Sequence, residues 1–476
     1  MLFSSIPFLL FFFPVVFAVY YALAFSRILQ NVWLLAASLV FYAWGEPVYV
    51  FLMIGSILFN SGAGFLVEKI DGKWKKIILA AAVTGNLLVL FLFKYAGFVL
   101  SFFGSYGEEA AARLDLSLPI GISFYTFQAL SYVIDVYRGK VKAENPFYVG
   151  LYISFFPQLI AGPIVQYRTI ADQLRNRKSS IDKISVGICR FVTGLGKKVL
   201  LANSFGVIAD YVFAWSEIGT DKLEVPASLA WLGSIAYTLQ IYFDFSAYSD
   251  MAIGLGLCFG FRFLENFNYP YIATSVTDFW KRWHISLTDW FREYVYISLG
   301  GNRTANKDTM VRNMFIVWLL TGIWHGANLT FVLWGLIYFG LLLAERIGEF
   351  DVKVSNVTLR RIYTLLAVNF LWVLFRAENL YQAGRMYMNM FAINNNGILS
   401  DTAWVLLREN IFYLIAGIIF CTPVARNINE RFYKNPESRL HQAYTLVYPV
   451  MMAGLAVICI SYLVTGSYNP FIYFNF

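Results

Sequence analysis

Residues 313–344 read NMFIVWLLTGIWHGANLTFVLWGLIYFGLLLA. This apolar run is longer than the roughly 20 residues with which one helix crosses a bilayer. Its middle carries two glycines, Gly322 and Gly326, with His325 between them. Both flanking segments contain several Lys and Arg, which mark the cytoplasmic side of a membrane protein. We therefore predict a bent, hairpin-like element that enters the membrane and returns to the same side, with His325 near its apex.

The composition indicates that the whole chain is a membrane protein. Of its 476 residues, 59% are hydrophobic and 14% are charged, whereas a soluble domain carries about 25% charged residues. The formal net charge is +8, but the excess Lys and Arg lie in short loops, where membrane orientation explains them without nucleic acid as a partner. The predicted fold class is an all-α polytopic membrane protein with about 10–12 transmembrane helices.

Apolar runs of suitable length define the other candidate spans. They are 6–25, 28–44, 48–67, 77–103 with a break near Lys94, 117–136, 199–215, 227–245, 362–376, 409–425 and 444–465. The first run meets its first charge, Arg27, only after its apolar residues, so we expect a retained span with an external N-terminus and not a cleaved signal. We find no internal repeat and expect residues 1–476 to form a single membrane domain.

Loop charge also identifies the irregular segments. The stretch 147–165 is interrupted by two prolines and a glycine and has basic loops on both sides, which predicts a re-entrant pair of half-helices. Segments 166–198 and 277–312 are basic or mixed in charge, and we expect them to be cytosolic or interfacial amphipathic segments. By the same count, the aromatic stretch 467–476 is extracytoplasmic.

The chain has three histidines, and His325 lies in the most unusual surroundings. An ionisable side chain at membrane depth is costly and indicates a function by default. The structural alternative is a neutral histidine that hydrogen-bonds two spans together. His441 lies in a charged loop before the last span, and we interpret it as an ordinary loop residue.

The remaining histidine, His284, belongs to the stretch TDFWKRWHISLTDWFREYVYISLGGNR. We predict one amphipathic helix from about Thr277, because large apolar residues recur at three- and four-residue spacing. These residues are Trp280, Trp283, Leu287, Trp290 and Phe291. Two interpretations remain open. The helix is either a membrane-surface anchor or the wall of a cytosolic entry site, with Lys281, Arg282 and Arg292 available for phosphates.

Two acidic residues, Asp244 and Asp250, lie in the apolar stretch IYFDFSAYSDMAIGLG. Acids at that depth must find partners. The glycines that follow do not form a dinucleotide-binding loop, because no strand of a βαβ unit precedes them. The cysteines have no metal-ligand spacing, so we expect core residues and no metal site. They are Cys189, Cys258, Cys421 and Cys459.

Several stretches together resemble the membrane-bound O-acyltransferase (MBOAT) family. They are FPQLIAGPIVQY, IYFDFSAYSDMAIGLG, FRFLENFNYPY, FWKRWHISLTDWFREYVYISLGGNR and GIWHGANLTFVLWG. The resemblance covers nearly the whole chain and is strongest to the bacterial branch of alginate and peptidoglycan O-acetyltransferase membrane subunits. It departs at Ala247, where a glycine is common, and at Leu329, where an aromatic residue is common. Neither departure touches the residues expected to transfer a proton. The departures therefore leave the identity of the acceptor undecided, but not the reaction class.

The resemblance implies a ring of helices around a thin centre, with a tunnel where a cytosolic thioester meets an acceptor from the other side. It implies that His325 is the catalytic histidine and that His284 is the second histidine of the family pattern. Acetyl-CoA is the implied donor, and no cofactor is expected to be permanently bound. Backbone N–H groups near Gly322 and the side chains of Trp324 and Asn328 are the candidate donors for the oxyanion.

The resemblance also implies a function for the aromatic stretch FIYFNF. It implies that Tyr473 carries the acyl group to an extracytoplasmic SGNH-type acetyltransferase partner, for O-acetylation of an envelope or exported polysaccharide. The chain would then lie in the bacterial inner membrane. We expect Phe471, Phe474 and Phe476 to anchor the stretch in an apolar tunnel. The structural alternative is that these residues belong to an aromatic belt at the membrane interface.

Two other functions are weighed against acetyl transfer. D-alanyl transfer to teichoic acid lies within the same family, but there the tyrosine motif is expected on a separate small protein. A transporter or flippase would also use broken helices and charges at membrane depth. It would leave the Trp- and His-containing stretch around His284 unexplained.

Overall fold

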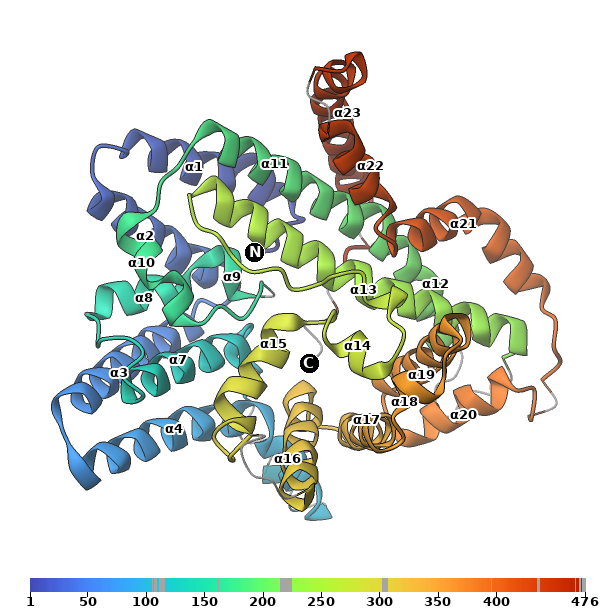
Figure 1. Ribbon diagram of the computed structural model, residues 1–476, viewed down its shortest axis with the longest axis horizontal. Helices are drawn as coiled ribbons and strands as arrows, with labels where there is room; N and C mark the ends of the chain where they lie inside the picture. The colour runs from blue at the N-terminus through green and yellow to red at the C-terminus, as the bar shows by residue number, and fades with distance from the viewer. Residues whose placement is uncertain are drawn as a thin grey trace. The chain divides into compact units, whose positions relative to one another are not determined.

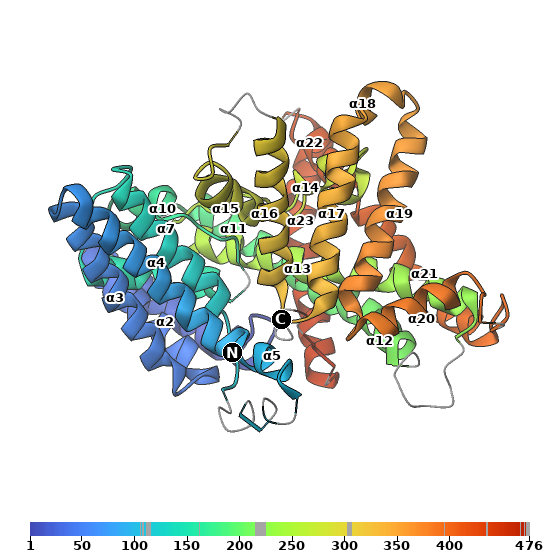
Figure 2. The same ribbon diagram turned by 90° about the horizontal axis from the view of Figure 1, so that it is seen from below.

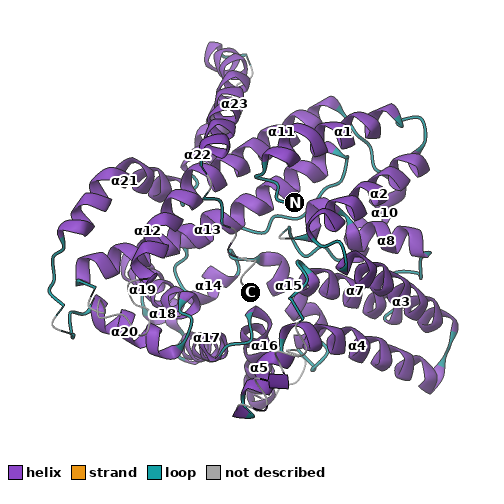
Figure 3. Ribbon diagram, turned by 180° about the vertical axis from the view of Figure 1, so that it is seen from behind, coloured by secondary structure: helices purple, strands orange, loops and turns teal. Residues whose placement is uncertain are grey.

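Within the residues that the structure describes, every regular element is helical (Figure 3). The structure is a computed structural model that describes residues 1–104, 106, 109–110, 116–160, 162–214, 225–301, 307–394, 396–434, 437–466, 468–470 and 472. The chain divides into two compact units. Unit 1 comprises Met1–Phe191, Ser249–Glu265 and Asp289–Ser298, and unit 2 comprises Val192–Tyr248, Asn266–Thr288 and Leu299–Phe476.

Unit 1 holds the N-terminal helices. In chain order these are η1 (Phe8–Phe12), α1 (Phe13–Ala22), α2 (Arg27–Gly45), α3 (Tyr49–Lys69), α4 (Gly72–Lys94), α5 (Ala96–Ser101), α7 (Ile122–Tyr137), α8 (Pro146–Ser154), α9 (Phe156–Leu159), α10 (Tyr167–Asn176), most of α11 (Ile181–Gly196) and later η4 (Arg292–Tyr296). The predicted break near Lys94 is confirmed, because α4 ends there and α5 begins two residues later.

Helices α3, α4 and α7 lie side by side in unit 1 (Figures 1 and 2). Asn60 of α3 and Asn86 of α4 exchange two side-chain hydrogen bonds, at 3.0 and 2.8 Å. A Cβ atom on Gly64 of α3 would lie 2.7 Å from the Tyr132 ring of α7. A small residue and a paired polar contact are the usual means by which helices associate in a bilayer, where the hydrophobic effect between helices is weak.

The predicted half-helices at 147–165 are observed as α8 and α9, which are separated by a break at Phe155. The break leaves backbone groups without helical partners, and side chains take their place. The Phe156 N–H donates to Ser38 Oγ at 3.1 Å, and the Tyr152 hydroxyl donates to the Val165 carbonyl at 2.7 Å. This backbone is buried within unit 1, as irregular structure at membrane depth requires.

Unit 2 holds the remaining elements. They are η2 (Lys197–Ala202), α12 (Asn203–Ala214), most of α13 (Ala227–Cys258), η3 (Pro270–Ile272), α14 (Val276–Trp280), part of α15 (Ile285–Phe291), α16 (Lys307–His325), α17 (Leu329–Ile347), α18 (Phe350–Lys353), α19 (Val357–Arg376), α20 (Leu380–Met390), α21 (Asp401–Phe420), α22 (Val424–Tyr433) and α23 (Arg439–Thr465). Helices α16, α17 and α19 run side by side (Figure 2).

Seven helices among the described residues are long and apolar enough to cross a membrane. They are α2, α3, α4, α17, α19, α21 and residues His441–Thr465 of α23. The prediction of about 10–12 spans was higher because it included further apolar runs. Those runs fold as shorter or more polar helices, such as α1, α7, α12 and α13. The prediction of an all-α, multi-pass membrane protein is confirmed.

The prediction of one continuous helix from about Thr277 is wrong. Helix α14 ends at Trp280, and α15 begins only at Ile285. Asn266 explains the interruption, because its carbonyl oxygen accepts from the Ile285 N–H at 3.0 Å and its side-chain oxygen accepts from the Ser286 N–H at 3.1 Å. These two N–H groups therefore donate to Asn266 and not to carbonyls of a continuous helix.

The predicted apolar stripe of this segment is buried inside the protein and does not face lipid. Trp280, Trp283 and Leu287 are at most 6% exposed within unit 2. In unit 1, Trp290 stacks on Phe127 with ring centroids 3.8 Å apart, and its indole N–H donates to the Phe127 carbonyl. The membrane-surface anchor is therefore the weaker of the two interpretations of this stripe.

Candidate active site

The hairpin predicted at residues 313–344 is confirmed. Helix α16 ends at His325, and α17 begins at Leu329 after a short turn. Asn328 starts α17, since its side-chain oxygen accepts from the Thr330 N–H at 3.1 Å, and its amide donates to the Glu378 carbonyl at 2.5 Å. His325 therefore lies at the apex, on a turn that is tied to both α17 and the end of α19.

Close helix packing holds this apex in place. A Cβ atom on Gly322 of α16 would lie 2.5 Å from the Phe331 carbonyl oxygen of α17. A Cβ atom on Gly335 of α17 would lie 2.5 Å from the Trp318 carbonyl oxygen of α16. Gly322 and Gly335 thus allow the backbones of α16 and α17 to approach each other closely.

Aromatic rings surround the His325 imidazole. Its ring centroid lies 5.1 Å from that of Trp334, 5.1 Å from that of Phe375 and 5.0 Å from that of Trp324, and all three rings meet it nearly edge-on. His325 is only 5% exposed. Because edge-to-face contacts restrict ring orientation, the imidazole is held in one plane by residues of α16, α17 and α19.

His284 is also close to Trp324. Its ring centroid is 6.3 Å from that of Trp324 and 4.6 Å from that of Phe245 on α13. It has a left-handed backbone, with φ of 45°, in the turn between α14 and α15. Burial lowers the pKa of His284 to about 3, so the side chain is neutral at pH 7. The structure thus brings both predicted histidines into contact with one indole ring.

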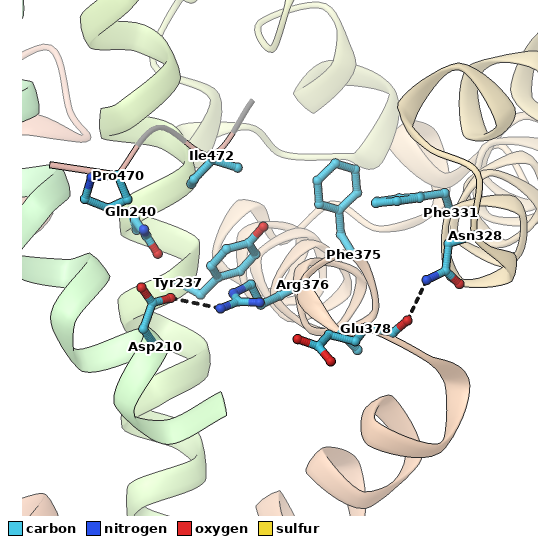
Figure 4. A pocket seen from close by; sticks show the side chains of 11 residues that line it. Asp210, Tyr237, Gln240, Asn328, Phe331, Phe375, Arg376, Glu378, Pro470 and Ile472 are labelled. Carbon is cyan, nitrogen blue, oxygen red and sulfur yellow. Dashed lines mark hydrogen bonds and ion pairs between the residues drawn. The ribbon is translucent and has the colours of Figure 1, made fainter. Parts of the chain in front are cut away.

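A cavity of about 320 Å³ in unit 2 adjoins the His325 cage. Phe375 contacts the imidazole and also lines the cavity, beside Phe331 (Figure 4). The opposite side is polar, and there Arg376 pairs with Asp210 at 2.9 Å. The full lining is Asp210, Tyr237, Gln240, Asn328, Phe331, Phe375, Arg376, Ala377, Glu378, Pro470 and Ile472.

The last described residue of the chain, Ile472, is part of this cavity wall. Its backbone N–H donates to the Asp244 side chain of α13 at 2.9 Å. Asp244 in turn forms an ion pair with Lys198 of η2 at 2.6 Å. The sequence predicted that Asp244 needs a partner, and the structure supplies two. Tyr473, Phe471, Phe474 and Phe476 lie outside the described residues.

The other predicted site residues lie apart from this cavity wall. Asp250 belongs to unit 1, where it pairs with Arg190 at 2.6 Å. Arg282 pairs with Asp278 at 2.9 Å on the outer side of the α14–α15 turn, and Lys281 beside it is exposed. These two cations remain accessible to an anionic ligand at that turn.

Sequence reasoning missed Asp210, Phe375 and Arg376, which line the cavity, and Lys198, which pairs with Asp244. One signal was present, because a lysine beside an apolar run is a natural partner for an acid buried in another. Phe375 and Arg376 carried no signal of their own, since an aromatic residue and an arginine at the end of a span are common.

The chain is a helical, multi-pass membrane protein, and comparison with known proteins gives its class. A model of the membrane-bound O-acyltransferase family matches residues 86–382, and the chain belongs to this family. Within the family it belongs to the branch of alginate and peptidoglycan O-acetyltransferases.

The relatives include a probable alginate O-acetylase, AlgI, of Azotobacter vinelandii, which is 40% identical over 513 residues and 100% of both chains. The corresponding protein of Pseudomonas syringae pv. tomato is 44% identical over 404 residues, which covers 83% of this chain and 76% of the relative. The peptidoglycan O-acetyltransferase of Helicobacter pylori is 32% identical over 523 residues, covering 100% of this chain and 98% of the relative.

Proposed function

We propose that this protein transfers an acetyl group from cytosolic acetyl-CoA to the Tyr473 hydroxyl. His325 accepts the phenolic proton as the phenolic oxygen attacks the thioester carbonyl. The carbon–sulfur bond then breaks, and the CoA thiolate takes the proton from the histidine. General-base catalysis of this kind is worth roughly 10²–10⁴-fold in rate.

One observation carries the proposal. Ile472, the residue before Tyr473, lines the same cavity as Phe375, whose ring contacts the His325 imidazole. The residue that precedes Tyr473 therefore lies at a cavity that shares Phe375 with the surroundings of His325, which supports Tyr473 as the acceptor. A phenol has a pKa near ~10, which makes its acetyl ester a better donor for the next transfer than a serine ester would be.

Other residues have supporting roles in the proposal. The ring of Trp324 is near those of both His325 and His284, so we assign it the task of orienting both. Lys281 and Arg282 at the α14–α15 turn are assigned to the phosphates of the donor. His284 is neutral at pH 7 and serves as a second hydrogen-bonding imidazole near the reaction centre.

The relatives named for alginate and peptidoglycan indicate where the acetyl group goes. We propose that an extracytoplasmic SGNH-type transferase takes it from Tyr473 and places it on a hydroxyl of an envelope or exported polysaccharide. The bacterial inner membrane is the site of this transfer.

The test uses the purified protein in liposomes with radiolabelled acetyl-CoA. We expect His325→Ala to reduce acetyl transfer to the protein by about 10²–10⁴-fold. His441→Ala is the matched control and should retain full transfer. His441 lies in the first turn of α23 and not in a loop as predicted, and its imidazole contacts the Phe432 carbonyl. Full transfer by the His325 variant would overturn the proposal.

A further inference from the structure

Lys198 and Asp244 form an ion pair that is almost entirely removed from solvent. Their side chains are 1% and 2% exposed, and Lys198 Nζ lies 2.6 Å from Asp244 Oδ1. Burying two charges in this way costs about as much free energy as their attraction returns, so such a pair is poor evidence of a contribution to stability. The pair therefore needs an explanation other than stability.

Each member of the pair also makes a hydrogen bond to one short segment of the chain. Lys198 Nζ donates to the carbonyl oxygen of Pro470, and the Ile472 N–H donates to Asp244 Oδ2 at 2.9 Å. Both contacts are to backbone atoms, on either side of position 471. Among the described residues, these are the contacts that each charge makes besides its partner.

The same segment is held further upstream. The Tyr468 hydroxyl donates to Asp210 Oδ2 at 2.6 Å, and the Asn203 side-chain amide donates to the Tyr468 carbonyl at 3.3 Å. Gly206 of α12 leaves room for it, because a Cβ atom there would lie 2.7 Å from the Tyr468 hydroxyl. Residues 468–470 and 472, called here the docked segment, are thus fastened to η2, α12 and α13.

We propose that the Lys198–Asp244 pair is a clamp that sets the register of the docked segment. Because it binds a carbonyl and an N–H of the backbone, it fixes direction and position independently of the side chains. The inference deepens the proposed function, on which it rests: Lys198 and Asp244 are positioning residues that present position 473 to the acetyl donor.

The first test removes a single donor and leaves the buried charges intact. Ile472→Pro deletes the N–H that Asp244 accepts, while Ile472→Leu keeps it and serves as the matched control. We expect the proline variant to acetylate Tyr473 about ten- to a hundredfold more slowly, since a hydrogen bond to a charged group has that worth. The KM for acetyl-CoA should stay unchanged, because the donor site is untouched.

The second test changes the clamp itself. Removing one charge alone leaves the other buried and unpaired and is expected to damage folding. The paired variants K198M/D244L and K198M/D244N avoid this, and only the asparagine retains an acceptor for the Ile472 N–H. We expect the leucine pair to acetylate Tyr473 more slowly than the asparagine pair, which should recover part of the rate.

Hydrogen–deuterium exchange of the peptide containing residues 466–476 measures docking of this segment independently of acetyl transfer. The leucine pair should exchange faster there than the unaltered protein, and K198M/D244N should lie between them. Equal protection in all three proteins would overturn the clamp, whatever the acetylation results. The two claims can fail separately. If exchange changes as expected but the unaltered protein puts no acetyl on Tyr473, the proposed function is refuted and the docking of the segment still holds.

Discussion

The α16–α17 contact makes Gly335 the most informative position for a stability test. A Cβ atom added there would lie 2.5 Å from the Trp318 carbonyl oxygen and 3.2 Å from Gly322 N. Both neighbours are backbone atoms, so a side-chain rotation cannot relieve the clash. Gly335→Ala must therefore separate the two helices near the apex that carries His325.

The expected magnitude follows from this geometry and from a control on the same helix. Overpacking of a well-packed contact costs typically about 1–3 kcal/mol. Gly340 of α17 has no atom within 4 Å of an added Cβ, so Gly340→Ala should stabilise the helix by about 0.5–1 kcal/mol. The two alanine variants should thus differ by about 1.5–4 kcal/mol, the sum of the two effects.

The assay is the thermal unfolding midpoint of the detergent-solubilised protein, with acetyl transfer measured in parallel. We expect Gly335→Ala to unfold at a lower temperature than the unaltered protein and to lose transfer, and Gly340→Ala to unfold no lower and to keep it. If both variants unfold at the same temperature with full activity, the reasoning that helix contact positions His325 is refuted.

Three further predictions concern other parts of unit 2. His284 has a folded-state pKa of about 3, below the unfolded value of 6.5, so its contribution to stability is complete above pH 6.5 and is lost as the pH falls towards 3. Stability should fall by about 1.4 kcal/mol per pH unit in that window, and the slope should be smaller in His284→Asn, whose side chain tolerates the left-handed backbone. Gly206→Ala should displace the Tyr468 hydroxyl, together with the Gln240 side chain, and raise deuterium exchange of residues 466–476, and unchanged exchange would contradict the close approach. Glu345→Ala should destabilise the protein by about 1–3 kcal/mol in thermal unfolding, because the N–H groups that begin α14 lose their acceptor, whereas Glu345→Gln should cost less.

Much of the fold follows from patterns in the sequence. The length of the 313–344 run, with Gly322, His325 and Gly326 at its centre, predicted the hairpin, because an apolar segment too long for one crossing has to bend or return. Prolines predicted the break between α8 and α9 in the same way. The continuous helix from Thr277 was wrong because Asn266, a residue outside the predicted helix, takes the amides of residues 285 and 286.

The site was predictable only in part. His325 and Asp244 could be found because polar groups in apolar runs are conspicuous. Their surroundings could not, since the ring of Phe375 and the amine of Lys198 reach the site through the packing of α19 and η2. Local sequence carries no record of such contacts. The docked segment was noticed for its aromatic residues, yet the described contacts that hold it are to backbone atoms and to Tyr468.

The central claim is that Tyr473 takes an acetyl group in a reaction that needs His325. The most direct measurement is mass spectrometry of the peptide containing residues 466–476 after incubation with deuterated acetyl-CoA. Tyr106, which is 85% exposed, provides an internal reference for non-enzymatic acetylation. We predict label on Tyr473 in the unaltered protein, none above the Tyr106 background in His325→Ala, and none on this peptide in Tyr473→Phe. Equal label on Tyr473 with and without His325, or no label in a preparation that acetylates its acceptor, would contradict the account.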